Sequence, residues 1–376
     1  MRVLVAGDFY PCGNTSVLIS EKQDYAGVLG NIRELVESVD YSIVNFESPV
    51  IGNDGSPIRK CGPNLRTTEN SVQAIKWAGF KMVSLANNHI LDYGEDGITG
   101  TINACIKYGI DTVGAGKNLK EASKVFYKQI GDQLLAVINC CEHEFSIATE
   151  HEAGANPLNL IQQYYQIKEA REKADYVLVI VHGGHEHFQL PSPRMLDTYR
   201  FFIDVGADVV VNHHQHYFSG YEVYKGKPIF YGLGNFCFED KGQYNVPWNE
   251  GYIVTINFDT EISFTLYPYL QCNGNSSVKL LVDDTSFKVK MNKLNDIIAN
   301  PEKLNCLCHE FYERHDKLSL SIFEPYIGKY FNAAFYRGWL PSFFKGKKPY
   351  VALNHIMCEA HRDKLIHLLN KKIKNK

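Results

Sequence analysis

Five apolar segments of this chain end in side chains that can bind metal ions. Each segment begins with residues typical of a buried strand and finishes in Asp, Glu, Asn or His. In α/β folds, strands separated by helices bring their carboxyl ends to one crevice, where ligands bind. We therefore expect the five polar ends to meet. The segments are Val3–Asp8 (VLVAGD), Ser42–Glu47 (SIVNFE), Met82–His89 (MVSLANNH), Tyr176–Glu186 (YVLVIVHGGHE) and Asp208–His216 (DVVVNHHQH).

These polar ends form a mixed set of oxygen and nitrogen donors. Carboxylate, amide and imidazole ligands suit Mn, Fe or Zn, and a set without thiolates argues against a structural zinc site. We expect two divalent cations, with Glu47 as the carboxylate that bridges them. The candidate donors at these ends are Asp8, Glu47, Asn88, His89, His182, Glu186, His214 and His216.

The last segment contains a His-x-His pair. On a regular strand His214 and His216 would share one face, whereas in a loop just past the strand they can diverge to separate cations. We interpret His213 and His187 as packing or supporting groups rather than ligands. His185 stays open between a contact with metal or substrate and no role in the site.

A metal-dependent reaction that expels a basic leaving group also needs a proton donor, and His is the side chain that most often supplies one. His89 is the predicted general acid, and Asp92, three residues on, is a candidate to orient it. The alternative is that Asp92 is a turn or capping residue ahead of Gly94. Lys60 and Arg66, in the loop after Glu47, are the cations predicted to grip an anionic substrate, although surface cations need no such role.

The elements that must position these residues alternate between strand and helix over about the first 220 residues. The patterns predict helices over 27–38, 97–108, 160–174 and 195–205, and another that carries Val72, Ile75 and Trp77. They predict a strand over 112–115 and a hairpin of 125–130 with 134–139. Three later runs are expected to be strands that pair antiparallel as the rim of a second sheet, namely 228–233, 252–258 and 262–270. Two sheets face to face, with helices outside, is the predicted architecture.

From about residue 273 the composition changes and glycine becomes rarer. Residues 280–315 read as helix with charged faces, an aromatic-rich stretch follows, and a last helix is expected from His355. We predict a helical appendage.

Composition narrows the functional class. With 39 basic and 42 acidic residues the chain has no broad basic field, so we expect no nucleic acid partner. No apolar stretch approaches the roughly 20 residues that span a bilayer, and Met1–Arg2 lead directly into a strand rather than a signal peptide. Ten scattered Cys without zinc spacing indicate reduced thiols. We expect a soluble, cytoplasmic protein without a membrane span.

Six motifs, in this order, resemble the CapA family of capsule and poly-γ-glutamate synthesis proteins. They are GDFYPCGN, NFESP, LANNHILDYG, HGGHE, NHHQHYFSGYE and IFYGLGNFCF, over residues 1 to about 240. That family is similar to the calcineurin-like metallophosphoesterases. The resemblance implies a four-layered αββα sandwich with a dinuclear metal centre over residues 1–272, and a helical accessory region over 273–376.

The resemblance also assigns residues. Six residues fall on ligand positions of the family: Asp8, Glu47, Asn88, His182, His214 and His216. His89 falls on the His beside the ligand Asn. Glu186 falls on the acidic position of the family's His-Trp-Gly-x-Glu motif, and Asn235 lies in a further signature, Gly232–Phe236, expected to shape the pocket floor. We count Glu186 and Asn235 as candidate substrate-binding residues.

The chain departs from the usual motifs at positions that affect the fine geometry of the metal site. The usual Asp-x-His of the first motif is Asp8-Phe9-Tyr10 here, so one cation lacks an imidazole unless Tyr10 or another group replaces it. His213 replaces a Gly and Gln215 a Pro at the terminal His-x-His, and Gly183 replaces the Trp of the HGGHE motif.

Three functional classes stay open at this level. The first is a metal-dependent phosphoesterase acting on an anionic small molecule or polymer. The second is a component of polymer synthesis or export that acts on an acyl phosphate or amide. The third is a non-catalytic scaffold, against which the nearly complete ligand set weighs, because buried carboxylates and imidazoles are costly to hold without a cation.

Overall fold

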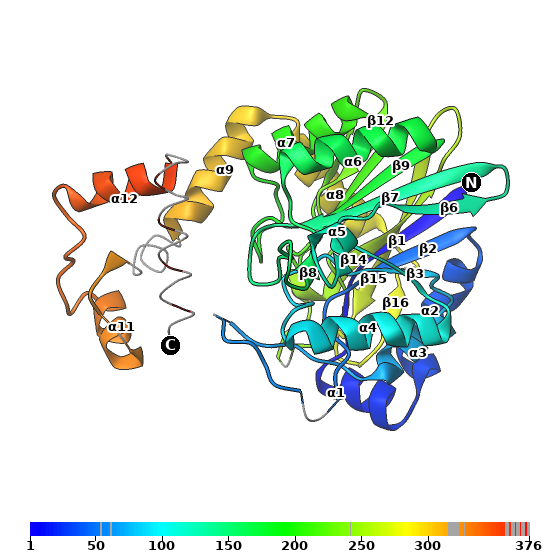
Figure 1. The fold of residues 1–376 in the computed structure, drawn as a ribbon, viewed down its shortest axis with the longest axis horizontal. Helices are drawn as coiled ribbons and strands as arrows, with labels where there is room; N and C mark the ends of the chain where they lie inside the picture. Colours follow the sequence, from blue (N-terminus) through cyan, green and yellow to red (C-terminus); the bar gives the residue numbers. More distant parts are fainter. Residues whose placement is uncertain are drawn as a thin grey trace. The chain divides into compact units, whose positions relative to one another are not determined.

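The computed structural model describes residues 1–357 except 53, 54, 61, 241, 315–322 and 327, and beyond these only 361, 365, 369 and 373. The chain divides into two compact units, Met1–Asn305 and Cys306–Lys376. The first unit holds both large sheets (Figure 1). It extends past residue 272, because helix α8 (Thr285–Ile298) packs against β11 (Tyr221–Tyr224).

The first sheet has eight strands in the order β16-β15-β14-β1-β2-β3-β4, with β13 beside the end of β1. Strands β1 to β4 are parallel, whereas β14, β15 and β16 are joined antiparallel. The bounds are β1 Arg2–Tyr10, β2 Tyr41–Phe46, β3 Met82–Ser84, β4 Asp111–Val113, β13 Asn235–Phe238, β14 Glu250–Asn257, β15 Ser263–Gln271 and β16 Val278–Leu280.

The second sheet has six strands in the order β11-β12-β10-β9-β7-β6. Its inner strands are parallel and its two edge strands antiparallel, and β6 with β7 forms the expected hairpin. Strands β9 and β10 are rich in valine and almost wholly buried, as parallel strands covered on both faces must be. The bounds are β6 Phe126–Ile130, β7 Gln133–Cys141, β9 Tyr176–His182, β10 Val209–His213, β11 Tyr221–Tyr224 and β12 Lys227–Phe230.

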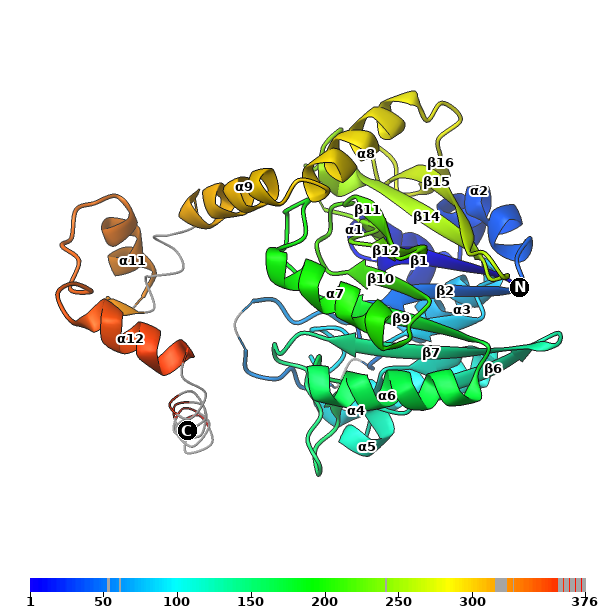
Figure 2. The same ribbon diagram turned by 90° about the horizontal axis from the view of Figure 1, so that it is seen from above.

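Helices cover the outer faces of the two sheets, so the first unit has four layers, αββα (Figures 1 and 2). Helices α6 and α7 pack on the second sheet, while α2 and α4 pack on strands of the first. The predicted sandwich is confirmed. The helices of this unit are α1 Gly13–Ser16, α2 Tyr25–Glu37, α3 Glu69–Trp77, α4 Gly94–Tyr108, α5 Leu119–Ala122, α6 Leu160–Lys173, α7 Pro193–Val205 and α8 Thr285–Ile298.

The three late strands were wrongly assigned to one sheet. The run 228–233 contributes β12 to the second sheet, whereas 252–258 and 262–270 contribute β14 and β15 to the first. Strand propensity carries no information on sheet membership, so the pattern could not separate them. The expected strand 112–115 is also interrupted at Gly114, whose φ of 95° separates β4 from β5 (Ala115–Gly116), which pairs with β8 (Gly154–Ala155).

The region expected as one helix over 280–315 forms two, α8 and α9 (Pro301–Arg314), with a break just before Pro301. His315, the expected end, lies outside the described residues. The second unit contains α11 (Lys329–Tyr336) and α12 (Lys348–Met357), so the last described helix begins earlier than His355. No helix within the described part of the chain has the length and apolar character to cross a bilayer.

In the first motif, the backbone at Gly7 lies very close to the backbone of Gly234. An ideal Cβ on Gly7 would lie 1.9 Å from the carbonyl oxygen of Gly234. That oxygen accepts a hydrogen bond of 3.2 Å from the amide of Asp8. Only glycine at position 7 lets β1 lie this close to the segment that precedes Asn235.

We predict that Gly7→Ala destabilises the protein by about 3 kcal/mol or more, because the added methyl group meets backbone that cannot move alone. The matched control is Gly30→Ala in α2, where a Cβ meets only side-chain atoms at 4.0 Å. That change should stabilise by about 0.5–1 kcal/mol, as Gly→Ala does in helices. Chemical denaturation measures both, and equal stability of the Gly7→Ala protein and the wild type would contradict the prediction.

Candidate metal centre

The carboxyl ends of five parallel strands meet in the first unit, as the sequence predicted. Two groups of side chains have ligand atoms that all lie within 4.8 Å of one another. The first is Glu47, His182 and His214, and the second is Asp8, Glu47 and His216. Glu47 belongs to both groups.

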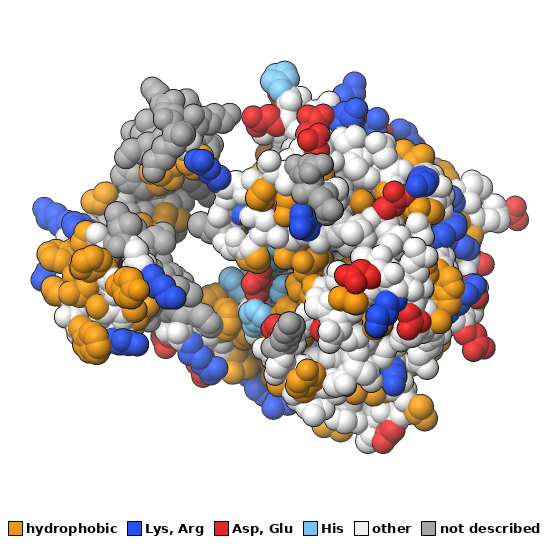
Figure 3. Space-filling model, turned by 90° about the horizontal axis from the view of Figure 1, so that it is seen from below, with side chains coloured by type: hydrophobic (Ala, Val, Ile, Leu, Met, Phe, Trp, Pro, Cys, Tyr) orange, Lys and Arg blue, Asp and Glu red, His pale blue; other side chains and the backbone are white. Residues whose placement is uncertain are grey.

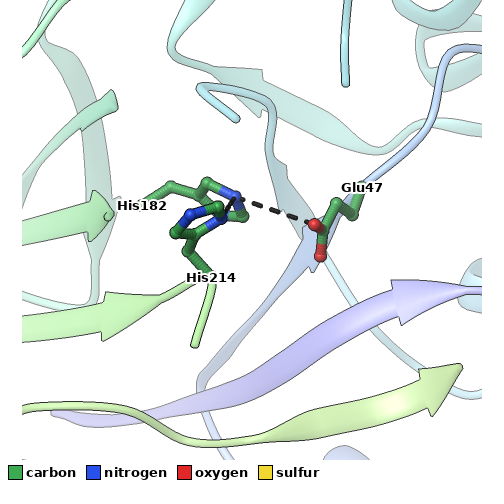
Figure 4. Close-up of side chains that lie close together, drawn as sticks. All are labelled: Glu47, His182 and His214. Atoms are coloured by element: carbon green, nitrogen blue, oxygen red, sulfur yellow. Dashed lines mark hydrogen bonds and ion pairs between the residues drawn. The ribbon is translucent and has the colours of Figure 1, made fainter. Parts of the chain in front are cut away.

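Three ligand atoms converge on Nε2 of His182. Oδ1 of Asn88 lies 3.0 Å from it, Nδ1 of His214 lies 3.1 Å away, and Oε1 of Glu47 lies 3.7 Å away. Figure 4 shows Glu47 opposite the two imidazoles, with its carboxylate directed at them. All six predicted ligands therefore lie together.

Histidine and acidic side chains gather on the face of the molecule seen in Figure 3. The six predicted ligands are nevertheless buried, with relative exposures of 6% or less. Asp8, Glu47 and Asn88 come from strands of the first sheet or the turns after them, and His182, His214 and His216 from the second.

Both oxygens of the Asp8 carboxylate have polar partners. Oδ1 accepts a hydrogen bond of 2.8 Å from Nδ2 of Asn45 and lies 3.3 Å from Nδ1 of His213. Oδ2 accepts a bond of 3.3 Å from the amide of His214 and lies 3.9 Å from Nδ1 of His216. Burial alone would raise the pKa of Asp8, but the bond from His213 and the charges of His213 and His216 outweigh it and lower the pKa.

Glu47 provides the test of whether a cation fits. Its side chain is fully buried, and neither carboxylate oxygen has a hydrogen-bond partner within the described part of the chain. Burial and the neighbouring charges of Asp8, Glu186 and Glu144 raise the pKa of Glu47 well above its usual value. A buried carboxylate without donors is costly, and divalent cations would offset that cost. The donor set fits the two predicted metal ions.

The imidazoles are suited to bind a cation at neutral pH. Burial, with the charge of His214, holds the pKa of His182 well below its ordinary value. Burial also lowers the pKa of His216 to about 4, although Asp8 acts in the opposite direction. Both rings are therefore neutral near pH 7, as metal ligands must be.

Asn235 contacts His216 rather than an open substrate surface. Nδ2 of Asn235 donates to the carbonyl of Trp248 at 3.5 Å, so its Oδ1 faces Nδ1 of His216 at 2.9 Å. That bond keeps the proton of His216 on Nδ1 and leaves the lone pair on Nε2. Fixing the tautomer of a metal-binding His in this way is common.

The predicted general acid lies in a buried charged cluster. Nδ1 of His89 lies 2.7 Å from Oδ2 of Asp92, which also accepts a bond of 2.6 Å from the amide of Leu65. Nζ of Lys60 forms an ion pair with Asp92 and lies 3.2 Å from Nδ1 of His89. The side chain of Lys60 is only 2% exposed. Lys60 thus lies inside the protein, where it neutralises Asp92, and not at an open surface that grips substrate.

The other two substrate candidates, Glu186 and Arg66, are exposed. The charge of Glu186 acts on both Glu47 and His216, so its carboxylate is near the centre. Among the described residues, Arg66 forms no ion pair, and no contact joins its guanidinium to the centre.

Tyr10 does not supply the imidazole that the first motif lacks. Its ring packs edge-on against Phe238, with centroids 4.9 Å apart. Burial, with smaller effects of Cys12 and Tyr93, raises the pKa of the phenol to about 12, so it stays protonated at neutral pH.

Sequence reasoning missed two polar groups at the centre. Asn45 lies two residues before Glu47 on β2, and this spacing was a usable signal. Oε2 of Glu144 accepts a bond of 3.0 Å from Nδ2 of Asn88, and its Oε1 lies 3.7 Å from Nε2 of His214. Glu144 follows β7, which is a sixth strand with a polar end.

Comparisons with known proteins agree with these motifs. The family model "Bacterial capsule synthesis protein PGA_cap" matches residues 2–240. The chain is 36% identical over 220 residues to the capsule biosynthesis protein CapA of Bacillus anthracis, covering 56% of this chain and 54% of the relative. It is 31% identical over 224 residues to the PGA biosynthesis protein CapA of Bacillus subtilis (strain 168), covering 59% of each. The chain spans about half the length of the curated relatives it matches.

Solved structures that resemble this one do so at a low level. A putative 5'-nucleotidase from Staphylococcus aureus has a TM-score of 0.46 and 16% identity, over 78% of this chain and 58% of that one. A phosphatase from Mycoplasma pneumoniae has a TM-score of 0.46 and 13% identity, over 72% and 93%. Similarity at this level says nothing about activity. The family match, by contrast, covers well over half of the chain and contains all six predicted ligands, so the chain belongs to the bacterial capsule synthesis protein family PGA_cap.

Proposed function

We propose that this chain is a hydrolase that uses two divalent metal ions to cleave a phosphate ester during the synthesis of a capsule or poly-γ-glutamate polymer. The observation that supports this most is Glu47, a fully buried carboxylate that belongs to two ligand groups and whose oxygens accept no hydrogen bond from any described residue. The membership in a capsule synthesis family supports the link to a polymer.

The residues that would hold the cations divide around Glu47. Asp8 and His216 lie on one side of it, and His182 and His214 on the other, with Asn88 beside His182. When bound, a pair of divalent cations polarises a phosphoryl oxygen and makes hydroxide available near neutral pH. Asn45, His213 and Asn235 would orient the ligands Asp8 and His216.

His89 is the proposed proton donor to the leaving oxygen. Its Nδ1 faces Asp92, so Nε2 is the nitrogen left to reach the substrate. Asp92 accepts from Nδ1 and from the amide of Leu65, and these bonds fix both the ring and the carboxylate. Lys60 balances the charge of Asp92 in a buried position, where an unpaired carboxylate would be costly.

An acyl phosphate is the second candidate substrate, and the relatives named for capsule and PGA biosynthesis favour keeping it. The two candidates differ in the leaving group. An alkoxide needs a proton as it leaves, whereas a carboxylate does not. The role of His89 therefore discriminates between them.

We predict that the protein hydrolyses a generic aryl phosphate when Mn²⁺ is supplied, and that His89→Ala lowers kcat by about 10²-fold to 10⁴-fold on an alkyl phosphate. The loss should be much smaller on p-nitrophenyl phosphate, because nitrophenolate leaves without a proton. Steady-state kinetics on both substrates measure the difference. An equal loss on both would contradict the role of His89 as an acid, and no hydrolysis of any phosphate with metal present would contradict the proposed function.

Glu47→Gln should separate the loss of folding stability caused by the buried carboxylate from the role of that carboxylate in binding a cation. Without metal, the raised pKa of Glu47 means that its contribution to stability is present at low pH and is lost as pH rises above about 4.5, where the unfolded chain ionises. The amide removes this loss, so at pH 8 the metal-free variant should be more stable than the wild type by about 1–3 kcal/mol.

Added Mn²⁺ should reverse that order, since it stabilises the wild type and has little effect on the variant. Denaturant unfolding at pH 5 and pH 8, with and without Mn²⁺, measures both effects. Equal stabilisation of the two proteins by Mn²⁺ would show that Glu47 does not hold the cation.

A further inference from the structure

A cavity of about 410 Å³ lies beside the metal centre in the first unit. One wall is the loop after β9, from His187 to Leu190, and another is helix α8, with Lys290, Lys293 and Leu294. Tyr217, which directly follows the ligand His216, also lines it. The proposed hydrolysis uses none of these groups.

One layer of aromatic rings joins the cavity to the centre. The ring of His187, which lines the cavity, lies 5.9 Å from the ring of His216 and stacks on Trp248 at 5.6 Å. Trp248 in turn lies 4.9 Å from His216. His187 thus lines the cavity on one side and lies beside the ligand His216 on the other.

Hydrogen bonds to the His-x-His loop hold the cavity wall in place. Nε2 of Gln215 donates to the carbonyls of Phe188 and Leu190, at 3.0 and 3.1 Å. The amide of His187 donates to the carbonyl of Gln215 at 2.9 Å, with His187 in the left-handed region at φ 59°. Gln215 stands where a related motif has Pro, which could not make these side-chain bonds. The wall is thus preformed and positioned by the same loop as the metal ligands.

The cavity offers a cation that is not paired. Lys290 forms an ion pair of 2.5 Å with Glu250, which lines the same cavity. Lys293 lies one helical turn further along α8 and forms no ion pair with any residue that the structure describes. Around it, Leu190, Leu294 and Ile297 provide apolar surface. Apolar walls with a few polar groups are typical of a small-molecule site, and the free ammonium favours an anion.

We propose that this cavity is a substrate subsite that binds a carboxylate-bearing chain, with Lys293 as the residue that contacts the anion. The inference rests on the proposed function, in which the same chain carries the group cleaved at the metal centre. An acidic polymer presents a carboxylate on each unit, so one unit reaches the cavity while another lies at the cations. Gln215 and His187 keep the two sites in register.

Lys293→Glu tests the subsite directly. The probe is a short oligomer of γ-linked glutamate, titrated calorimetrically into the Mn²⁺-loaded protein, with the uncharged γ-linked glutamine oligomer as its counterpart. We expect the variant to bind the glutamate oligomer about tenfold more weakly than the wild type or worse, and the glutamine oligomer to bind weakly to both. Lys293 is exposed, so the substitution should not affect folding.

The matched control is Lys288→Glu, a change of the same charge on α8 at an exposed residue that does not line the cavity and pairs with Asp284 at 2.9 Å. It should leave binding of the glutamate oligomer within about twofold of the wild type. Four outcomes would each overturn the subsite. Two concern the variants: both weaken binding equally, or Lys293→Glu leaves binding unaltered. The other two concern the probes: the two oligomers bind with equal affinity, or the wild type binds no oligomer.

Hydrolysis of p-nitrophenyl phosphate separates this inference from the proposed function. That substrate has no carboxylate-bearing chain, so its hydrolysis by the Mn²⁺-loaded wild type tests the metal centre without the subsite. A protein that binds the glutamate oligomer through Lys293 but hydrolyses no phosphate would keep the subsite and lose the proposed hydrolase. If the protein hydrolyses the phosphate but Lys293→Glu does not change binding of the oligomer, the proposed hydrolase is kept and the subsite is lost.

Discussion

The unpaired carboxylate of Glu47 is the constraint on which the rest of the centre depends. A fully buried carboxylate surrounded by other acids destabilises a folded protein unless positive charge compensates it. No ammonium or guanidinium within the described part of the chain pairs with Glu47, whereas Asp92, nearby, has Lys60. The groups that face Glu47 are instead imidazoles, and burial lowers the pKa of one of them, His182, so that it is neutral near pH 7. This arrangement is expected of a site that binds a cation. In a scaffold without a cation, the buried carboxylate would lower the stability of the fold.

The candidate centre could largely be predicted because it follows from topology. Parallel strands end at a common edge, so Asp8 and Glu47, at the ends of the paired strands β1 and β2, had to come near one another once their segments were recognised as strands. The two layers of sheet were predictable from the periodicity. Which sheet takes β12 and which takes β14 was not, because each run has the same strand propensity and the choice depends on contacts far apart in sequence.

The contribution of loops could not be predicted, for a different physical reason. Lys60 lies in an irregular loop rich in Gly and Pro, and no periodic pattern fixes where such a segment turns its side chains. A lone lysine in a loop is usually exposed, yet here the carboxylate of Asp92 draws it into the interior. The same limit hid the cavity of Lys293, whose wall depends on bonds that Gln215 makes to a separate loop.

The origin of the ligands suggests why the two sheets and the centre depend on each other. The first sheet supplies the oxygen donors Asp8, Glu47 and Asn88, and the second supplies the nitrogen donors. With Tyr10 in place of an imidazole, the imidazoles that the described residues bring near Asp8 are those of His213 and His216, from the segment at the end of β10. A cation bound there would therefore connect two strands of different sheets. Its affinity would depend on how closely the sheets pack, and its binding would in turn hold them together.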